Sequence, residues 1–239
     1  MSESAREWLI AHRGWPARHP ENSLEGIRAV LDAGARFVEI DVQISADGRP
    51  VAFHDEELRR TTGRDGRLTA LRLAELRSLE LVGGGRIPTL EEAIEAIGRF
   101  PGTTAFVELK RHSIRRFGRR RAVELVCERI REAHCPCVFL SFDRRATVLA
   151  RDAGVERIGW VLRRRSIVHR LMARSLRPDF LFVSAGRAGG RRPFWTGPWR
   201  WAVYGVDTLD QGRDWRSRGA DLIEVDDLPG LLETARDGR

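Results

Sequence analysis

The chain has 239 residues, of which 42% are hydrophobic, and its formal net charge is +8. This length and apolar content allow a sizeable core, and no apolar run approaches the roughly 18 residues that a membrane-spanning helix needs. The positive charge favours anionic partners such as phosphates, anionic lipid surfaces or nucleic acid. Among the 42 basic residues only Lys110 is a lysine, and lysine brings a compact point charge to a crowded site.

The N-terminal segment is a poor match to a secretory signal. Residues 1–7 carry two acids, and only a short apolar run follows them. Signal peptides instead combine a basic start with an apolar stretch of about 7–15 residues. We therefore expect a cytoplasmic protein.

Short apolar runs alternate with amphipathic segments from the start of the chain. Their spacing predicts strands at 8–11, 37–44 and 49–54 and a helix at 23–33. Residues 56–88 break this alternation, because they hold several glycines and only a short helical stretch near 73–81. We expect an insertion there.

The alternation resumes at Thr89, which with Glu92 forms a capping box at the start of a helix. Further strands are expected at 104–109, 138–140, 157–161, 180–183, 199–204 and 222–225, and helices near 119–133, 144–153, 166–175, 208–218 and 229–236. Alternation of this kind predicts a parallel sheet. Roughly eight such units favour a closed TIM (βα)8 barrel, as one domain over residues 1–239, rather than an open doubly wound sheet. Residues 184–198 are rich in Gly, Arg and Pro, so any helix there must be short.

Residues suited to chemistry follow or end the expected strands, where barrel proteins carry their active sites. They are His12, Arg13, Glu39, Asp41, His54, Glu108 and Lys110. Taken alone, a strand carboxylate usually pairs with an arginine, and a histidine after a strand usually has a structural role. The combination on four separate elements favours phosphoryl chemistry, in which a metal ion and basic side chains neutralise phosphate while histidines share acid and base work.

Glu39 and Asp41 form the most informative pair. They lie two residues apart on one strand, so both point to the same face with Cα atoms about 7 Å apart. Two carboxylates so close repel each other unless a cation lies between them. Oxygen ligands favour Mg²⁺ or Ca²⁺ over zinc, and Glu108 can complete the set.

The same residues stand in an ordered series of motifs, dense over residues 9–110 and thinner beyond. The series reads Ala11-His12-Arg13-Gly14, Pro20-Glu21-Asn22-Ser23, Glu39-Ile40-Asp41-Val42, His54-Asp55, Arg60-Thr61-Thr62-Gly63 and Val107-Glu108-Leu109-Lys110. It resembles the glycerophosphodiester phosphodiesterase family, within the superfamily of phospholipase C-like phosphodiesterases. The resemblance implies a TIM barrel with a small insertion after the second strand region, in agreement with the insertion expected at 56–88.

The resemblance also implies roles for individual residues. His12 and His54 match the acid and base, and Arg13 and Lys110 match phosphate-binding positions. The acids tied to the divalent cation match Glu21, Glu39, Asp41 and Glu108. The family converts glycerophosphodiesters to an alcohol and sn-glycerol 3-phosphate in phospholipid turnover, so we expect a small-molecule substrate. The choice between Mg²⁺ and Ca²⁺, the division of roles between the histidines and the oligomeric state stay undetermined.

The later motifs differ from the family pattern. Trp201 matches a residue of the substrate pocket, but Ala202 and Tyr204 replace the Thr and Asn of the family's W-T-V-N, and Asp226 lies in a region with one added residue. These differences leave the expected metal and acid–base residues intact. They leave the alcohol head group undetermined.

Other functions remain as alternatives. The first is a lysophospholipase D-like enzyme acting at an anionic membrane, because residues 111–121 and 163–177 hold six arginines each and the second segment interleaves them with apolar residues. Solvated helix faces in an arginine-rich protein are the favoured explanation of these runs. A non-catalytic phosphate binder is disfavoured because His12, Glu39, Asp41 and His54 are all present. Nucleic acid is not an expected partner, because no recognisable binding module is present.

Overall fold

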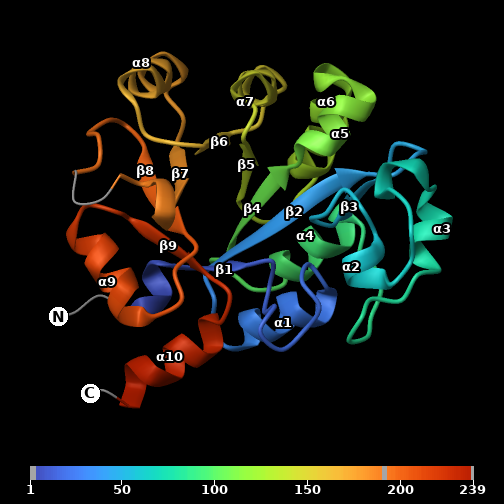
Figure 1. Cartoon of the computed structure of the whole chain (residues 1–239), viewed down its shortest axis with the longest axis horizontal. Helices are drawn as coiled ribbons and strands as arrows, with labels where there is room; N and C mark the ends of the chain where they lie inside the picture. Colours follow the sequence, from blue (N-terminus) through green and yellow to red (C-terminus); the bar gives the residue numbers. More distant parts are fainter. Residues whose placement is uncertain (1–3, 190–192, 238–239) are drawn as a thin grey trace.

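The computed structural model describes residues 4–189 and 193–237. In these ranges, eight strands run parallel and close into a barrel in the order β1-β9-β8-β7-β6-β5-β4-β2, with β2 pairing back to β1 (Figure 1). The barrel strands are β1 (Leu9–His12), β2 (Phe37–Ile44), β4 (Thr104–Leu109), β5 (Cys137–Ser141), β6 (Arg157–Leu162), β7 (Phe180–Ser184), β8 (Arg200–Tyr204) and β9 (Leu222–Val225). The predicted TIM barrel is therefore confirmed.

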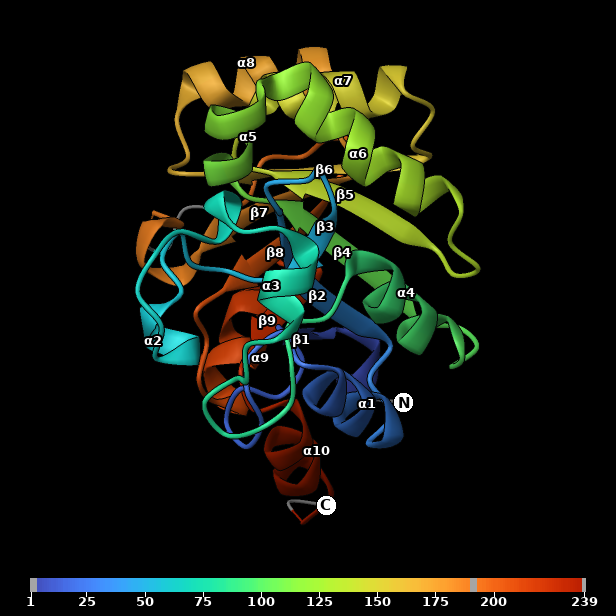
Figure 2. The same ribbon diagram turned by 90° about the vertical axis from the view of Figure 1, so that its right-hand side faces the viewer.

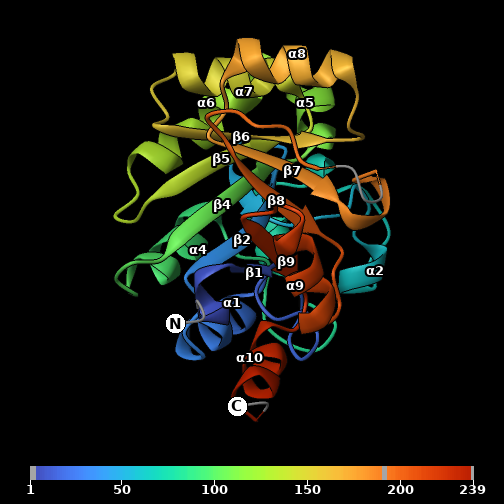
Figure 3. The same cartoon turned by 90° about the vertical axis from the view of Figure 1, so that its left-hand side faces the viewer.

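Helices surround the barrel, as Figures 1 and 3 show. They are α1 (Leu24–Asp32), α4 (Leu90–Gly98), α5 (Arg111–Phe117), α6 (Arg119–Arg131), α7 (Arg144–Asp152), α8 (Ile167–Leu176), α9 (Leu209–Ser217) and α10 (Leu228–Asp237), with 3-10 turns at Ala5–Glu7 and Ala185–Arg187. Side-chain caps fix where several begin: the Thr89 hydroxyl accepts from the Glu92 amide, and Ser166 accepts from that of His169. The described helices contain none that is long and apolar enough to cross a membrane.

The sequence predicted most of these elements, with two differences. Residues 49–54 contain a short strand, β3 (Pro50–Ala52), which pairs antiparallel with β2 and is not a barrel strand. Helix α5 was not predicted, because its segment has four charged residues or histidines among seven and lacks a long apolar stripe. In the region 184–198, where any helix was expected to be short, the structure has the 3-10 turn Ala185–Arg187; residues 190–192 lie outside the described part of the chain.

The insertion between β2 and α4 has an apolar core of its own. It contains α2 (Arg59–Thr62), a 3-10 turn (Leu68–Ala70) and α3 (Leu73–Arg77), which ends before the predicted limit of residue 81. Figure 2 shows α2 and α3 on one side of the barrel. Five buried side chains of the insertion pack on one another, on Val51 of β3 and on Phe53 just after it; they are Leu58, Leu68, Leu76, Leu81 and Ile87. This packing anchors the insertion beside the segment that carries His54.

Alternation along the strands divides the barrel interior into two layers. Side chains two residues apart share a face, so Ile10 precedes His12, Phe106 precedes Glu108 and Leu222 precedes Glu224 on the inner face. Phe106 packs edge-on against Phe180 and Phe182, with ring centroids 5.1 and 5.4 Å apart. The amino-terminal part of the interior is therefore filled with apolar side chains, and polar groups occupy the carboxyl-terminal end.

Candidate active site

A cavity of about 190 Å³ opens above this apolar layer at the carboxyl ends of the strands. Its polar lining consists of His12, Arg13, Glu39, Asp41, His54, Glu108, Lys110, Tyr204 and Glu224, and its apolar lining of Leu140, Phe142, Val161 and Phe182. The barrel thus brings seven of the nine predicted site residues to one cavity. Glu21 and Trp201 are not among the residues that line it.

Three carboxylates form the centre of the polar wall. Glu39 and Asp41 are 2% and 1% exposed, and Asp41 pairs in register with Glu108 on the neighbouring strand. One oxygen of each of the three residues lies within 4.8 Å of the others. The strand spacing therefore places Glu39 and Asp41 on one buried face, as expected from the sequence.

Two cations neutralise Asp41. Its carboxylate lies 2.7 Å from Nε of Arg13 and 2.9 Å from Nζ of Lys110, which also lies 2.8 Å from Glu108. Burial disfavours the ionised form, but Lys110 and Arg13 outweigh this effect and hold the pKa of Asp41 well below its usual range. Asp41 is therefore a carboxylate at neutral pH despite its burial.

The loop after β1 is fixed by hydrogen bonds to the side chain and the backbone of Asp41. Arg13 and Asn22 both adopt left-handed backbone conformations, with φ of 54° and 59°. The Asn22 amide donates to Asp41, and the Asp41 backbone N–H donates to Asn22 Oδ1 at 3.0 Å. Asparagine tolerates this backbone region better than most residues. The bonds of Asn22 to Asp41, and that of its backbone N–H to the Arg13 carbonyl at 2.9 Å, connect the loop that carries Arg13 to β2.

His12 lies between two acids that the sequence analysis did not assign to the site. Its Nδ1 is 2.7 Å from Asp226, and its Nε2 is 3.4 Å from Glu224 and 3.9 Å from Glu39. Burial lowers the affinity of the ring for a proton, but Glu224 and the hydrogen bond to Asp226 outweigh it and raise the pKa of His12 to about 10. In this arrangement His12 is an imidazolium at neutral pH.

His54 has the opposite charge preference. Its Nδ1 lies 2.7 Å from Asp55, and Gln43 donates to the backbone carbonyl of His54 at 3.0 Å. Burial, and after it the positive charges of Lys110 and Arg13, outweigh the attraction of the nearby acids and lower the pKa of His54. The two histidines of the cavity are thus biased towards different protonation states.

Glu21 is engaged by arginines beside the cavity. Arg60 of the insertion binds both of its oxygens, at 2.7 and 2.8 Å, and Arg13 lies 3.3 Å away. Among the described residues, Glu21 groups with His54 and Asp55 and not with the three central carboxylates. This geometry does not place Glu21 among the ligands of a cation at the central cluster. It instead supports a role in which Glu21 positions Arg13.

Trp201 lies on the outer face of the barrel. It is 2% exposed and packs against Phe194 and Trp195, and its indole N–H donates to the Trp195 carbonyl at 3.0 Å. Because side chains alternate along β8, Tyr204 points inward and lines the cavity in its place. The predicted place of Trp201 in the pocket wall is thus corrected to Tyr204.

Glu224 is the main residue that sequence analysis missed. It lies in the buried run Leu222–Val225 and is itself 5% exposed. A carboxylate flanked by Ile223 and Val225 repeats the pattern of Glu39 between Val38 and Ile40, and that repetition is the signal that could have revealed it.

The cavity holds more buried negative charge than its cations balance. Burial and the neighbouring acids Asp41 and Glu224 raise the pKa of Glu39 well above its ordinary value. Burial also raises the pKa of Glu224, to about 7. Oε1 of Glu39 is buried without a hydrogen-bond partner. An additional cation with a preference for oxygen ligands, such as Mg²⁺ or Ca²⁺, fits this donor set.

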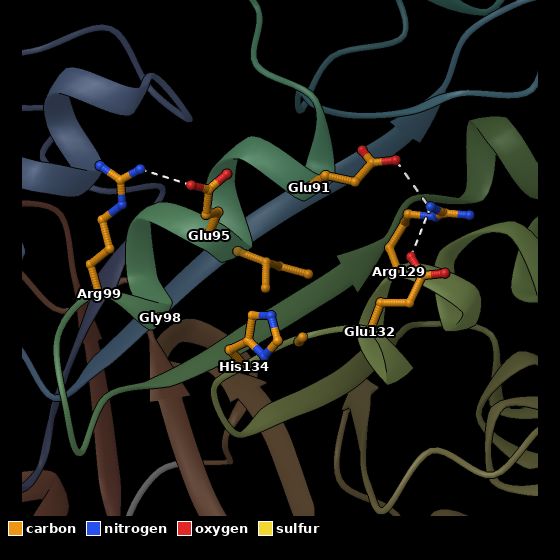
Figure 4. A pocket seen from close by; sticks show the side chains of 9 residues that line it. Glu91, Glu95, Gly98, Arg99, Arg129, Glu132 and His134 are labelled. Carbon is orange, nitrogen blue, oxygen red and sulfur yellow. Dashed lines mark hydrogen bonds and ion pairs between the residues drawn. The ribbon is translucent and has the colours of Figure 1, made fainter.

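A larger cavity, of about 450 Å³, lies between α4 and α6 (Figure 4). Its charged side chains are engaged with one another: Arg99 pairs with Glu95 at 2.7 Å, and Arg129 pairs with Glu91 and with Glu132. None of its described residues belongs to a group that could hold a metal ion. It offers no comparable chemistry.

The fold and the smaller cavity together define a βα barrel with an acidic, histidine-flanked site at its strand ends, where barrel enzymes carry their active sites. The sequence profile of the glycerophosphoryl diester phosphodiesterase family matches residues 12–152, more than half of the chain. The protein belongs to this family, and the resemblance found in its motifs is confirmed.

Relatives agree with this assignment. The chain is 39% identical over 97 residues to the glycerophosphodiester phosphodiesterase of Caldanaerobacter subterraneus subsp. tengcongensis, an alignment that covers 38% of this chain and 40% of the relative. For the Bacillus altitudinis enzyme the identity is 35% over 116 residues, with 46% and 47% covered. The chain therefore spans less than half the length of these curated relatives.

Among solved structures, an Oleispira antarctica phosphodiesterase in complex with the product sn-glycerol-3-phosphate superimposes with a TM-score of 0.84 at 26% identity. The aligned region covers 98% of this chain and 100% of the Oleispira chain. The likeness thus extends over the whole barrel.

Replacing Glu224 by Gln should lower the pKa of His12. Glu224 is the largest of the contributions that favour the imidazolium, so its removal leaves the opposing effect of burial less compensated. NMR titration of histidine-labelled, EDTA-treated protein measures the shift, with His134 as an internal reference in the distant cavity of Figure 4. An unchanged His12 titration in the variant would show that Glu224 does not control this proton.

Proposed function

We propose that the protein is a phosphodiesterase that hydrolyses glycerophosphodiesters to an alcohol and sn-glycerol 3-phosphate in phospholipid turnover. The observation that carries this proposal is one cavity in which His12 and His54 flank a buried carboxylate cluster beside Arg13 and Lys110. The product bound by the Oleispira relative supports the substrate class. A cytoplasmic location stays a prediction from the N-terminal sequence.

We further propose that Glu39, Asp41 and Glu108 hold a divalent cation, Mg²⁺ or Ca²⁺. The unpartnered Oε1 of Glu39 and the raised pKa of its carboxyl group support this assignment. A cation bound there would neutralise charge on the phosphate and favour deprotonation of the nucleophile. Glu224 lies close enough to the cluster to add to its negative potential.

Arg13 and Lys110 are suited to bind the phosphate. Both line the cavity, and both are paired with Asp41, which fixes their positions before a substrate arrives. Burial opposes the charge of Lys110, but Glu108 and Asp41 outweigh burial and raise its pKa, so it keeps its proton. Preorganised donors of this kind each contribute about 3 kcal/mol to transition-state stabilisation in other enzymes.

The two histidines differ in the direction in which they can move a proton. His54, with its lowered pKa, is suited to accept the proton of the attacking water or hydroxyl group. His12 is held protonated by Glu224 and Asp226 and is suited to donate a proton to the leaving oxygen. Asp55 and Asp226 orient the two rings through their Nδ1 atoms.

One observation supports the lysophospholipase D-like alternative, namely the exposed apolar side chains of α8. They would bring the barrel to a lipid surface, where a single-chain lipid could serve as substrate. The small volume of the cavity, about 190 Å³, favours the water-soluble glycerophosphodiesters over this alternative.

Turnover of a substrate panel tests the activity. We expect release of sn-glycerol 3-phosphate from glycerophosphocholine, glycerophosphoethanolamine and glycerophosphoglycerol with Mg²⁺ or Ca²⁺, and none after treatment with EDTA. Turnover of a lysophospholipid in preference to these diesters would favour the alternative. Failure to cleave any of them would contradict the proposed function, and full turnover by metal-free protein would contradict the cation.

The roles of the histidines predict different dependences on the leaving group. His12→Ala should lower kcat for glycerophosphocholine by about 10²–10⁴-fold, the usual contribution of a general acid. The same variant should lose much less on a glycerol nitrophenyl phosphate diester, because nitrophenolate leaves without protonation. His54→Ala should impair both substrates alike.

His134→Ala is the matched control, since this ring lies in the separate cavity between α4 and α6 (Figure 4). It should retain wild-type kcat on both substrates. The assigned roles would be reversed if His12→Ala lowered kcat equally on both substrates while His54→Ala lost much less kcat on the nitrophenyl diester than on glycerophosphocholine.

A further inference from the structure

The outward face of α8 is apolar. Ile167, Val168, Leu171 and Met172 are 66%, 53%, 59% and 38% exposed. Their spacing places them on one side of the helix, because residues three and four apart are neighbours on a helix surface. Of the other large hydrophobic side chains in the described ranges, only Val82 is comparably exposed.

The opposite side of α8 already packs against the barrel. Ala173 and Leu176 are buried in the main core, and His169 stacks on Trp160 with ring centroids 5.6 Å apart. A surface helix normally has one apolar stripe and a polar remainder. The second apolar face of α8 is therefore not explained by the packing of the fold.

Arginines border this face without acidic neighbours in the same segment. Residues 163–177 contain six arginines and no Asp or Glu. Arg163, Arg164 and Arg174 are exposed, and none of them pairs with an acid in the part of the chain that the structure describes. The combination of exposed apolar side chains and a basic border is typical of helices that bind at the surface of anionic membranes.

The other arginine-rich segment, residues 111–121, provides a comparison within the same molecule. There Arg115 pairs with Glu56 at 2.8 Å, Arg119 with Asp143 at 3.0 Å and Arg121 with Glu124. Its apolar residues Ile114 and Phe117 are not among the exposed large hydrophobic side chains. A solvated, salt-bridged helix face describes that segment, but it does not describe α8.

We propose that α8 docks the protein on an anionic lipid membrane. Ile167, Val168, Leu171 and Met172 enter the boundary between headgroups and acyl chains, and the bordering arginines contact lipid phosphates. Figures 1 and 3 show α8 at the outer edge of the molecule, where a flat surface can reach it. Its first turn follows β6 after a short connection, so it lies near the rim at which the cavity opens.

The charge and the apolar side chains of this face together favour a membrane over the other binding partners that α8 could have. A second copy of the chain would bring two sets of these arginines together, and residues 163–177 supply no acid to compensate them. Nucleic acid would match the arginines but leave the four apolar side chains in water. An anionic membrane matches both components, and the inference does not depend on the proposed catalytic activity.

Vesicle sedimentation tests the proposal. The full chain should sediment with phosphatidylcholine vesicles that contain about 30% phosphatidylglycerol, a proportion chosen to give a strongly negative surface. It should remain in the supernatant with phosphatidylcholine alone. Leu171→Glu should weaken binding to the anionic vesicles by at least about tenfold, because it places a charge in the apolar contact.

Two matched variants control for hydrophobicity and net charge. Val82→Glu changes an equally exposed apolar residue that lies away from α8 and should bind as the wild type does. The triple replacement of Arg163, Arg164 and Arg174 by Gln should weaken binding by at least about tenfold, because each arginine adds to the attraction of an anionic surface. The same change at Arg116, Arg120 and Arg121 removes equal charge and should have a smaller effect. Circular dichroism melting confirms that each variant is folded.

Several results would overturn the proposal. They are absence of binding to anionic vesicles, equal binding by Leu171→Glu and Val82→Glu, and equal losses in the two triple variants. Analytical ultracentrifugation identifies the alternative occupant. A dimer that Leu171→Glu dissociates, without vesicle binding by the wild type, would assign the face to a second copy of the chain.

Discussion

The pairing of Asp41 with Arg13 and Lys110 is the interaction on which the site depends. Asp41 is 1% exposed, and an unpaired carboxylate in such a position would be strongly destabilising. Removing one partner of a buried ion pair typically costs about 3–5 kcal/mol. The three residues come from β2, from the loop after β1 and from the end of β4, so one carboxylate links three neighbouring parts of the barrel rim. Asn22, in the same loop as Arg13, is a third partner of Asp41 through two hydrogen bonds.

The remaining electrostatics of the cavity follow from this arrangement. Burial raises the pKa values of Glu39 and Glu224, and the negative charge of the nearby Asp41 raises both further. Burial lowers the pKa of both histidines. The acids beside His12 outweigh burial and raise its pKa, whereas Lys110 and Arg13 beside His54 add to burial and lower its pKa further. The asymmetry between the histidines thus originates in the positions of the fixed charges around them. A buried oxygen of Glu39 is left without a hydrogen-bond partner, at the position where we propose that a cation binds.

The sequence was sufficient for features that depend on local periodicity. The alternation of strands and helices predicted the barrel, and the two-residue spacing of Glu39 and Asp41 predicted their shared buried face. Trp201 shows the limit of this reasoning, because alternation fixes that Trp201 and Tyr204 point to opposite faces but not which of them points inward. The strand β3 was predicted as extended, but its antiparallel pairing depends on contacts with β2 that a strand pattern does not encode.

Long-range contacts account for the other residues that were missed. Asp226 meets His12 across 214 positions of sequence, and Glu224 reaches the same ring because β9 pairs with β1 when the barrel closes. In the nearby sequence, neither contact is indicated by anything more than an acidic residue within or next to an apolar run. The arginine runs show the same limit, since the segments 111–121 and 163–177 look alike in composition. Only the structure distinguishes paired arginines in the first from an exposed apolar face in the second.

We propose that the buried carboxylate cluster holds a divalent cation, and titration of the metal-free protein with Mn²⁺, followed by electron paramagnetic resonance, would detect it. Mn²⁺ accepts the oxygen ligands that Mg²⁺ prefers. We predict one tightly bound Mn²⁺ per chain, lost in Glu39→Gln and retained in Glu91→Gln, whose side chain lies in the cavity between α4 and α6. Binding of equal affinity and stoichiometry in the wild type and Glu39→Gln would show that the cluster is not the cation site.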